Sequence, residues 1–272
     1  MRGKIITIEG LDGAGKSTQI NLLTQKLNEM GIKHKFIHFP MLNQGVYGTL
    51  IAEFLRGEYG SLEEVHPKLV ALLFAEDRNE HQHKIRQWLE EGYLVILDRY
   101  VQSNIAFQCA KLSDDAEKEQ LKQWILEFEF EYNKLPKPSV SVFLNVPIEH
   151  IEKSLKNQRK GEDRTYLEGK IDIHEASIKF QKKVLVEYLK MLKENPGFYR
   201  IDCFSETGEW LAPETIHQSI MDKLNFLKQK KYREWLKKQP YLIQIKIITS
   251  LFFPNFYNVL KRTMKLNHSN LK

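Results

Sequence analysis

Cysteine is scarce in this sequence, and long apolar runs are missing. The two cysteines, Cys109 and Cys203, cannot build a disulfide framework and lack the spacing of a metal site. We therefore expect a reducing, cytoplasmic environment. No uninterrupted apolar stretch reaches the ~18 residues of a membrane-spanning helix. The apolar run near Met1 is too short for a secretory signal.

No charge of one sign dominates most of the chain, although the formal net charge is +6. Residues 228–272 contain eleven Lys and Arg and one acid, a net +10, so residues 1–227 carry −4. Because the larger part is mildly acidic, the basic pI does not predict a nucleic-acid-binding protein, and we expect no such partner. With 42% hydrophobic and 28% charged residues, the chain has an ordinary globular composition.

Short apolar segments alternate with helical patterns along the first 227 residues. The expected strands are 4–9, 35–39, 93–97, 139–144 and 198–202. Apolar residues at helical spacing, as in 16–30, predict helices between them. This alternation predicts an α/β fold, a doubly wound parallel sheet of about five strands with helices on both faces. Ligands of such sheets bind at the carboxyl ends of the strands.

A glycine-rich turn joins the first expected strand to the first expected helix and matches the pattern G-x-x-x-x-G-K-[ST]. Glycines let the backbone curl so that its N–H groups point at phosphate oxygens, and the helix N-terminus adds positive charge. Lys16 would reach the β- and γ-phosphates, and Ser17 would ligate Mg²⁺. The pattern therefore predicts binding of a nucleoside triphosphate. The residues assigned to it are Gly10, Leu11, Asp12, Gly13, Ala14, Gly15, Lys16, Ser17 and Thr18.

Two charged residues follow the expected strand 93–97. Asp98 would hold the water shell of the magnesium ion, and Arg99 would face a phosphate. The alternative is that Asp98 caps the next helix, with Arg99 as its surface partner. The phosphate loop elsewhere in the sequence favours the first interpretation.

Several motifs in this order and spacing resemble the thymidylate kinase family. They are IEGLDGAGKSTQ at 8–19, Phe39-Pro40, LFAEDR at 73–78 and DRYVQSNIAFQ at 98–108. The likeness extends over one expected domain, 1–227. It implies a P-loop NTPase fold with a mobile lid. It also implies phosphoryl transfer from ATP to dTMP, giving dTDP and ADP for dTTP synthesis, with Mg²⁺ as cofactor and a homodimer as the assembly.

The resemblance also implies roles for individual residues in binding dTMP. Asp12 is similar to a carboxylate that accepts from the 3′-OH, and Phe74 resembles an aromatic that stacks on thymine. Arg78, one helical turn later, would donate to a thymine carbonyl. For Phe74, packing in the core is the competing interpretation. The full set is Asp12, Phe39, Phe74, Arg78, Arg99, Ser103, Asn104, Phe107 and Gln108.

Within this set, Arg99 would grip the acceptor phosphate, and Phe107 would crowd a ribose 2′-OH and so favour deoxynucleotides. Asn104 and Gln108 lie where the family reads the base.

A polar stretch around 158–164 resembles the family's lid, which we place at about 158–172. Part of the family carries an arginine inside the phosphate loop, where this chain has Gly13. The other part uses basic lid residues, which implies that Arg159 and Arg164 act with Lys16 and Arg99 in catalysis. By composition alone, the stretch is a solvated loop. The residues 172–175 would anchor the lid.

Two regions depart from the family pattern. Many relatives have an arginine after Phe39-Pro40, whereas this chain has Met41, so that phosphate contact is lost or supplied by Arg56 or Lys111. The extension 228–272 has no expected counterpart. It packs on the body or a dimer partner, lies on a membrane surface as a basic and apolar anchor, or is loosely ordered without a role.

Two rival functions stay open at this stage. The chain is either a kinase for another deoxypyrimidine monophosphate, such as dUMP or dCMP, or a nucleotide-sensing relative with little turnover. A guanine-specific switch is disfavoured, because the sequence lacks an N-K-x-D signature.

Overall fold

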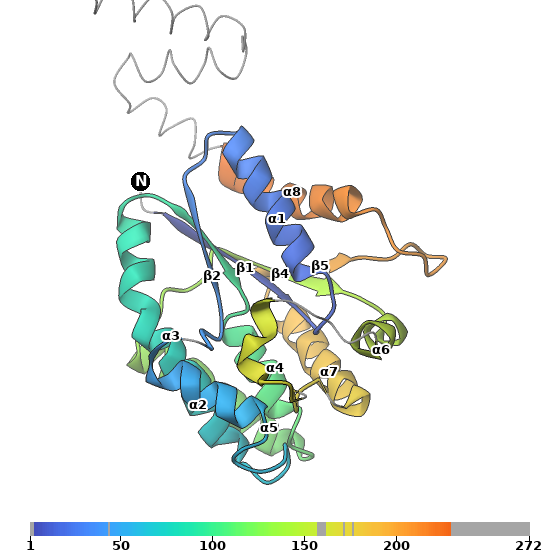
Figure 1. The fold of residues 1–272 in the computed structure, drawn as a ribbon. Coiled ribbons are helices and arrows are strands. Elements are labelled where there is room, and N and C mark those ends of the chain that lie inside the picture. The colour runs from blue at the N-terminus through green and yellow to red at the C-terminus, as the bar shows by residue number, and fades with distance from the viewer. Residues whose placement is uncertain (1–2, 43, 157–161, 171, 176, 230–272) are drawn as a thin grey trace, which may run out of the picture. The chain divides into compact units, whose positions relative to one another are not determined.

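The computed structural model describes residues 3–42, 44–156, 162–170, 172–175 and 177–229 (Figure 1). Side chains at 154–156, 162–164 and 225–229 lie outside this description. The chain divides into two units, Met1–Lys223 and Leu224–Lys272. The first unit contains the sheet and the pocket. The predicted domain boundary after residue 227, and the role of the extension, stay predictions.

A five-stranded sheet forms the centre of the first unit, in the order β2-β3-β1-β4-β5. Every neighbouring pair is parallel, which confirms the predicted α/β sheet. The strands are β1 (Lys4–Gly10), β2 (His34–His38), β3 (Leu94–Asp98), β4 (Val140–Asn145) and β5 (Phe198–Asp202).

Helices cover both faces of the sheet, as predicted. Figure 1 shows α1 and α8 over one face and α3, α4 and α7 over the other. Between strands β1 and β4 the helical elements are α1 (Lys16–Glu29), α2 (Gly45–Leu55), α3 (Pro67–Glu90), α4 (Val101–Cys109), α5 (Asp115–Leu126) and the π-helical turn η1 (Glu127–Tyr132). After β4 come α6 (Ile148–Lys156), the 3₁₀ turn η2 (Glu162–Leu167), α7 (Ile178–Glu194) and α8 (Pro213–Gln229).

The central strands read as continuous apolar runs because helices bury them on both sides. Ile6, Ile96 and Val142 on neighbouring strands have no exposed surface. Parallel register places Ile8 and His38 on either side of Asp98. The carboxyl ends of β1, β2 and β3 therefore meet at one edge, which positions the site. In the described ranges, no helix has the length and apolar character needed to cross a membrane.

Phe143 tests the packing beneath this edge. It lies in β4 with no exposed surface, and its ring centroid is 4.7 Å from that of Tyr188. Phe143→Ala leaves a cavity, so we expect the free energy of unfolding to fall by about 3–5 kcal/mol in chemical denaturation. The control Val186→Ala, on the exposed side of α7, should change it by less than about 0.5 kcal/mol. Equal losses in the two variants would contradict this core.

Candidate active site

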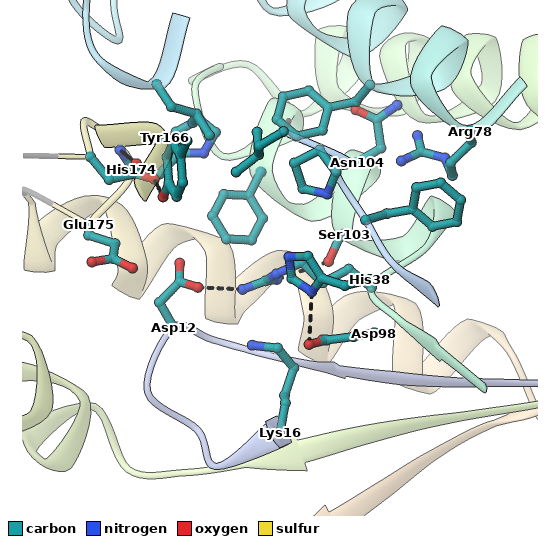
Figure 2. A pocket seen from close by; sticks show the side chains of 18 of the residues that line it. Asp12, Lys16, His38, Arg78, Asp98, Ser103, Asn104, Tyr166, His174 and Glu175 are labelled. Atoms are coloured by element: carbon teal, nitrogen blue, oxygen red, sulfur yellow. Dashed lines mark hydrogen bonds and ion pairs between the residues drawn. The ribbon is translucent and has the colours of Figure 1, made fainter. Parts of the chain in front are cut away.

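A pocket opens at the carboxyl edge of the sheet, between the phosphate loop and helices α3 and α4 (Figure 2). All nine residues predicted to bind dTMP line it, together with Lys16, Ser17 and Asp98. The sequence patterns are far apart in the chain, and parallel strand order brings them together. The other lining residues are His38, Pro40, Leu42, Leu55, Tyr166, Asp172, His174 and Glu175.

The phosphate loop lies at one end of the pocket. Gly13 and Gly15 both have φ of 84°, a left-handed conformation that glycine adopts without strain. Gly15 is also the residue that precedes α1, so the helix N-terminus faces the pocket. The Lys16 Nζ donates to the carbonyl oxygens of Gly10 and Leu11, at 3.4 and 3.1 Å. The lysine is thus held over the loop that the sequence assigns to phosphate.

Asp98 ends β3 beside this loop. Its Oδ2 lies 3.0 Å from Nδ1 of His38, and its buried Oδ1 has no hydrogen-bond partner among the described residues. Burial by itself would raise the pKa of Asp98, but the His38 hydrogen bond and the charge of Lys16 lower it below its ordinary value. The alternative role as a helix cap is wrong, because α4 begins at Val101 with Tyr100 as its capping residue.

The donors at this end fit a magnesium ion. An ionised carboxylate with an unsatisfied oxygen and the exposed Ser17 hydroxyl are the oxygen ligands that Mg²⁺ prefers. No group of three or more His, Cys, Asp or Glu converges on a metal position within the described part of the chain.

Arg99 lies between the two ends of the pocket and is held from several sides. Its Nη2 donates to Asp12 Oδ1 at 2.6 Å, its Nη1 donates to Ser103 Oγ at 3.0 Å, and its guanidinium lies 5.0 Å from the Phe107 ring centroid. The backbone at Arg99 has φ of 64°, which a non-glycine residue rarely adopts. Burial alone would lower the pKa of Arg99, but Asp12 and neighbouring acids raise it above its ordinary value.

Behind Arg99 lies Glu9, near the end of β1, to which the sequence motifs assign no role. Its buried carboxylate accepts from the backbone N–H of Tyr100 at 2.8 Å, from Ser103 at 2.7 Å and from the Tyr188 hydroxyl at 3.0 Å. Burial raises the pKa of Glu9, and these donors partly offset the rise. Glu9 therefore fixes Ser103, which in turn contacts Arg99.

The opposite end of the pocket carries aromatic and amide side chains. Phe74, on α3, is half-buried, lines the pocket and stacks with His174 at 6.4 Å between centroids. Its stacking on thymine stays a prediction. Figure 2 places Arg78 and Asn104 at this end, away from Lys16. Gln108 is buried on the same helix as Asn104.

Arg78 is 2% exposed and forms a two-bond ion pair with Glu129, with Nε and Nη2 both 2.6 Å from carboxylate oxygens. Burial alone would lower the pKa of Arg78, but Glu129 raises it. The sequence motifs predict that Arg78 donates to a base, but they assign no role to Glu129. The signal was an acidic residue at helical spacing from the buried Leu121 and Ile125.

Tyr166 and Asp172, from the predicted lid, and His174, just after it, line one side of the pocket. The Tyr166 hydroxyl donates to Asp172 Oδ2 at 2.7 Å, and the backbone N–H of His174 donates to Oδ1 at 2.7 Å. The His174 ring lies 5.1 Å from that of Phe107. Burial lowers the pKa of His174 well below its ordinary value, which keeps the ring neutral.

Among the described side chains, those of Arg56 and Lys111 do not line the pocket. Arg56 donates to Glu58 and to the carbonyl of Tyr166, and the Lys111 amine lies 4.6 Å from the Phe54 ring centroid. A role for either residue in place of the missing arginine after Pro40 stays a prediction. Arg159 lies outside the described residues, and Arg164 is described only by its backbone in η2.

The pH dependence of stability tests the environment of Asp172. Burial, with Asp12 and Glu175 nearby, raises the pKa of Asp172 from 3.8 to about 7. Between these values the native state binds more protons at this site than the unfolded state, so the site lowers stability as pH rises. Asp172→Asn cannot titrate. Urea unfolding at pH 5, 6, 7 and 8 should show the variant gaining stability relative to wild type as pH rises, whereas parallel curves would contradict this burial.

Comparisons with known proteins agree with this geometry. Residues 8–210 match the family described as Thymidylate kinase. A thymidylate kinase from Brachyspira hyodysenteriae is 31% identical over 210 residues, covering 72% of this chain and 96% of the relative. One from Mycobacterium tuberculosis is 40% identical over 146 residues, 53% of this chain and 67% of the relative.

A solved structure of thymidylate kinase from Candida albicans is 28% identical, with a TM-score of 0.62, and the match covers 84% of this chain and 93% of that one. Sequence, fold and the arrangement of the pocket lead to the same conclusion: the chain belongs to the thymidylate kinase family.

Proposed function

We propose that this protein transfers the γ-phosphoryl group of ATP to dTMP, giving dTDP and ADP. The observation that carries the proposal is one pocket with a phosphate loop at one end, an aromatic and amide end opposite, and Arg99 between them. Two anionic nucleotides fit such a pocket end to end. Family membership supports the same reaction.

At the ATP end, backbone amides after Gly10 and the N-terminus of α1 surround the β- and γ-phosphates. Lys16 exchanges its carbonyl partners for phosphate oxygens, a stronger charge-assisted contact. When bound with ATP, Mg²⁺ neutralises phosphate charge. Ser17 would supply a hydroxyl ligand, and Asp98 would accept from the water shell through Oδ1, which has no partner among the described residues.

At the acceptor end, thymine lies against Phe74, and Arg78 and Asn104 contact its edge. Arg99 holds the acceptor phosphate, and its contacts with Asp12 and Ser103 fix the guanidinium in place before binding. No general base is required, because the acceptor is already a phosphate anion. Positioning and charge neutralisation supply the acceleration.

Further parts of the proposal follow from the family resemblance. Arg159 and Arg164 reach the transferring phosphoryl group when the lid closes, so their charge arrives only with both substrates bound. The chain works as a homodimer in the cytoplasm.

Acceptor preference tests the reaction itself. Coupled ADP release with dTMP, dUMP, dCMP and dGMP should give the highest kcat/KM for dTMP, with little release when the acceptor is omitted. Lys16→Ala should lower kcat by at least about 100-fold, because a preorganised positive donor to the phosphates is lost. Preference for another acceptor, or ADP release that dTMP does not stimulate, would overturn the proposal.

The lid arginines are tested by separating kcat from KM. Removing an interaction that is made only in the transition state lowers kcat without raising KM for either substrate. We expect Arg159→Ala or Arg164→Ala to reduce kcat by about 10³-fold, in line with other arginines that contact a transferring phosphoryl group. Normal kcat in both variants would exclude the lid role.

A further inference from the structure

Glu129 joins three elements at the aromatic and amide end of the pocket. It lies in the π-helical turn η1 with no exposed surface. Its Oε2 accepts from Arg78 on α3, and its Oε1 accepts from both Arg78 and Asn104, the latter on α4. One buried carboxylate therefore contacts both side chains that face the base in the proposed function.

The direction of the Asn104 amide follows from these contacts. Its Nδ2 donates to Glu129 Oε1 at 2.9 Å and to the carbonyl oxygen of Ala71 at 3.0 Å, which uses both N–H bonds. Its Oδ1 is buried and has no partner among the described residues. A flipped amide would place this oxygen against a carboxylate and a carbonyl. Asn104 lines the pocket, and this oxygen is the polar atom of its side chain that has no partner among the described residues.

Arg78 is constrained by the same carboxylate. Nε and Nη2 are both bound to Glu129, so the guanidinium plane is fixed and Nη1 is the nitrogen outside the pair. A guanidinium has only donors. The pocket end thus carries a fixed acceptor from Asn104 beside a fixed donor from Arg78.

We propose that Glu129 is a positioning residue that sets this acceptor–donor order and thereby selects a pyrimidine with an N3–H donor and a neighbouring carbonyl. Thymine and uracil have this edge. Cytosine reverses both groups, with an acceptor at N3 and an exocyclic amine. The inference rests on the proposed function, because it concerns how the same pocket chooses its nucleoside monophosphate.

Wild-type enzyme gives the first test. Turnover of dTMP and dUMP should exceed that of dCMP and of N3-methyl-dTMP by about 100-fold or more in kcat/KM, because a mismatched base leaves buried polar groups unpaired. Equal use of dCMP would overturn the assignment of Glu129. Absence of turnover with every acceptor would instead overturn the proposed function.

Glu129→Gln gives the second test. A glutamine side chain has one acceptor oxygen and one NH2 group, so it cannot accept all three N–H groups that Arg78 and Asn104 direct at Glu129. Its NH2 group then faces one of these donors, which weakens the constraint on the Asn104 amide. The ratio of kcat/KM for dTMP to that for dCMP should fall by at least about tenfold, while the ratio for dTMP to dUMP stays unchanged. A purely structural role would lower activity with all acceptors alike and leave both ratios intact, which would overturn the proposal.

Controls keep this result interpretable. Glu131→Gln makes the same change at an exposed position two residues away and should leave both ratios at their wild-type values. Thermal unfolding and binding of a fluorescent ATP analogue report whether Glu129→Gln is folded. Should it fail to fold, Glu129→Asp keeps the charge but is too short to reach both partners, and the same fall in the dTMP to dCMP ratio is expected. An unchanged ratio in a folded Asp variant would also overturn the proposal.

Discussion

The parallel register of β1, β2 and β3 is the constraint on which the site depends. Because these strands run in the same direction and pair without offset, the phosphate loop, His38 and Asp98 emerge at one edge. An antiparallel neighbour would send its carboxyl end to the far side of the sheet. The apolar interior of these strands is therefore what holds the charged edge together.

Burial of charge is the second organising feature of the pocket. Lys16, Arg78, Arg99, Asp98, Glu9 and Glu129 are all at most 9% exposed. Such groups are tolerated because they are paired or hydrogen-bonded, and removing one partner would leave an uncompensated charge. Arg99 shows the benefit for phosphate binding, because Asp12 and Ser103 hold its guanidinium in one orientation before a substrate arrives. A phosphate anion that enters the pocket can replace or join Asp12 and Ser103 as a partner of Arg99.

The two ends of the pocket are built by different means. The phosphate loop consists of backbone and side chains of one contiguous turn, and Asp98 and His38 join it from the neighbouring strands β3 and β2. The opposite end depends on side chains from α3, α4 and η1 that meet across the fold. In the proposed function, selectivity for the acceptor base would therefore depend on the residues that contact the ligand and also on residues, such as Glu129, that orient them.

The sequence by itself determined the alternating fold and the phosphate loop. Both follow from local patterns: apolar segments of strand length, and glycines at the positions where φ is positive. Motif likeness also identified the nine residues assigned to dTMP, and these line one pocket. The roles of Arg159 and Arg164 and of the extension stay predictions, since they concern residues or side chains outside the described part of the chain.

Only the tertiary structure decided the partners of these residues. In η1 the Asn133 N–H bonds to the Phe128 carbonyl, five residues back, which widens the turn. Helical spacing from the buried Leu121 and Ile125 fits both Phe128 and Glu129. In the wider turn Glu129 is the buried residue, and Phe128 stacks on Trp124. Likewise, Asp98 meets His38 and Tyr166 meets Asp172 through packing of separate segments. Local pattern specifies which residues are polar, whereas the pairing of buried charges depends on contacts between segments distant in the chain.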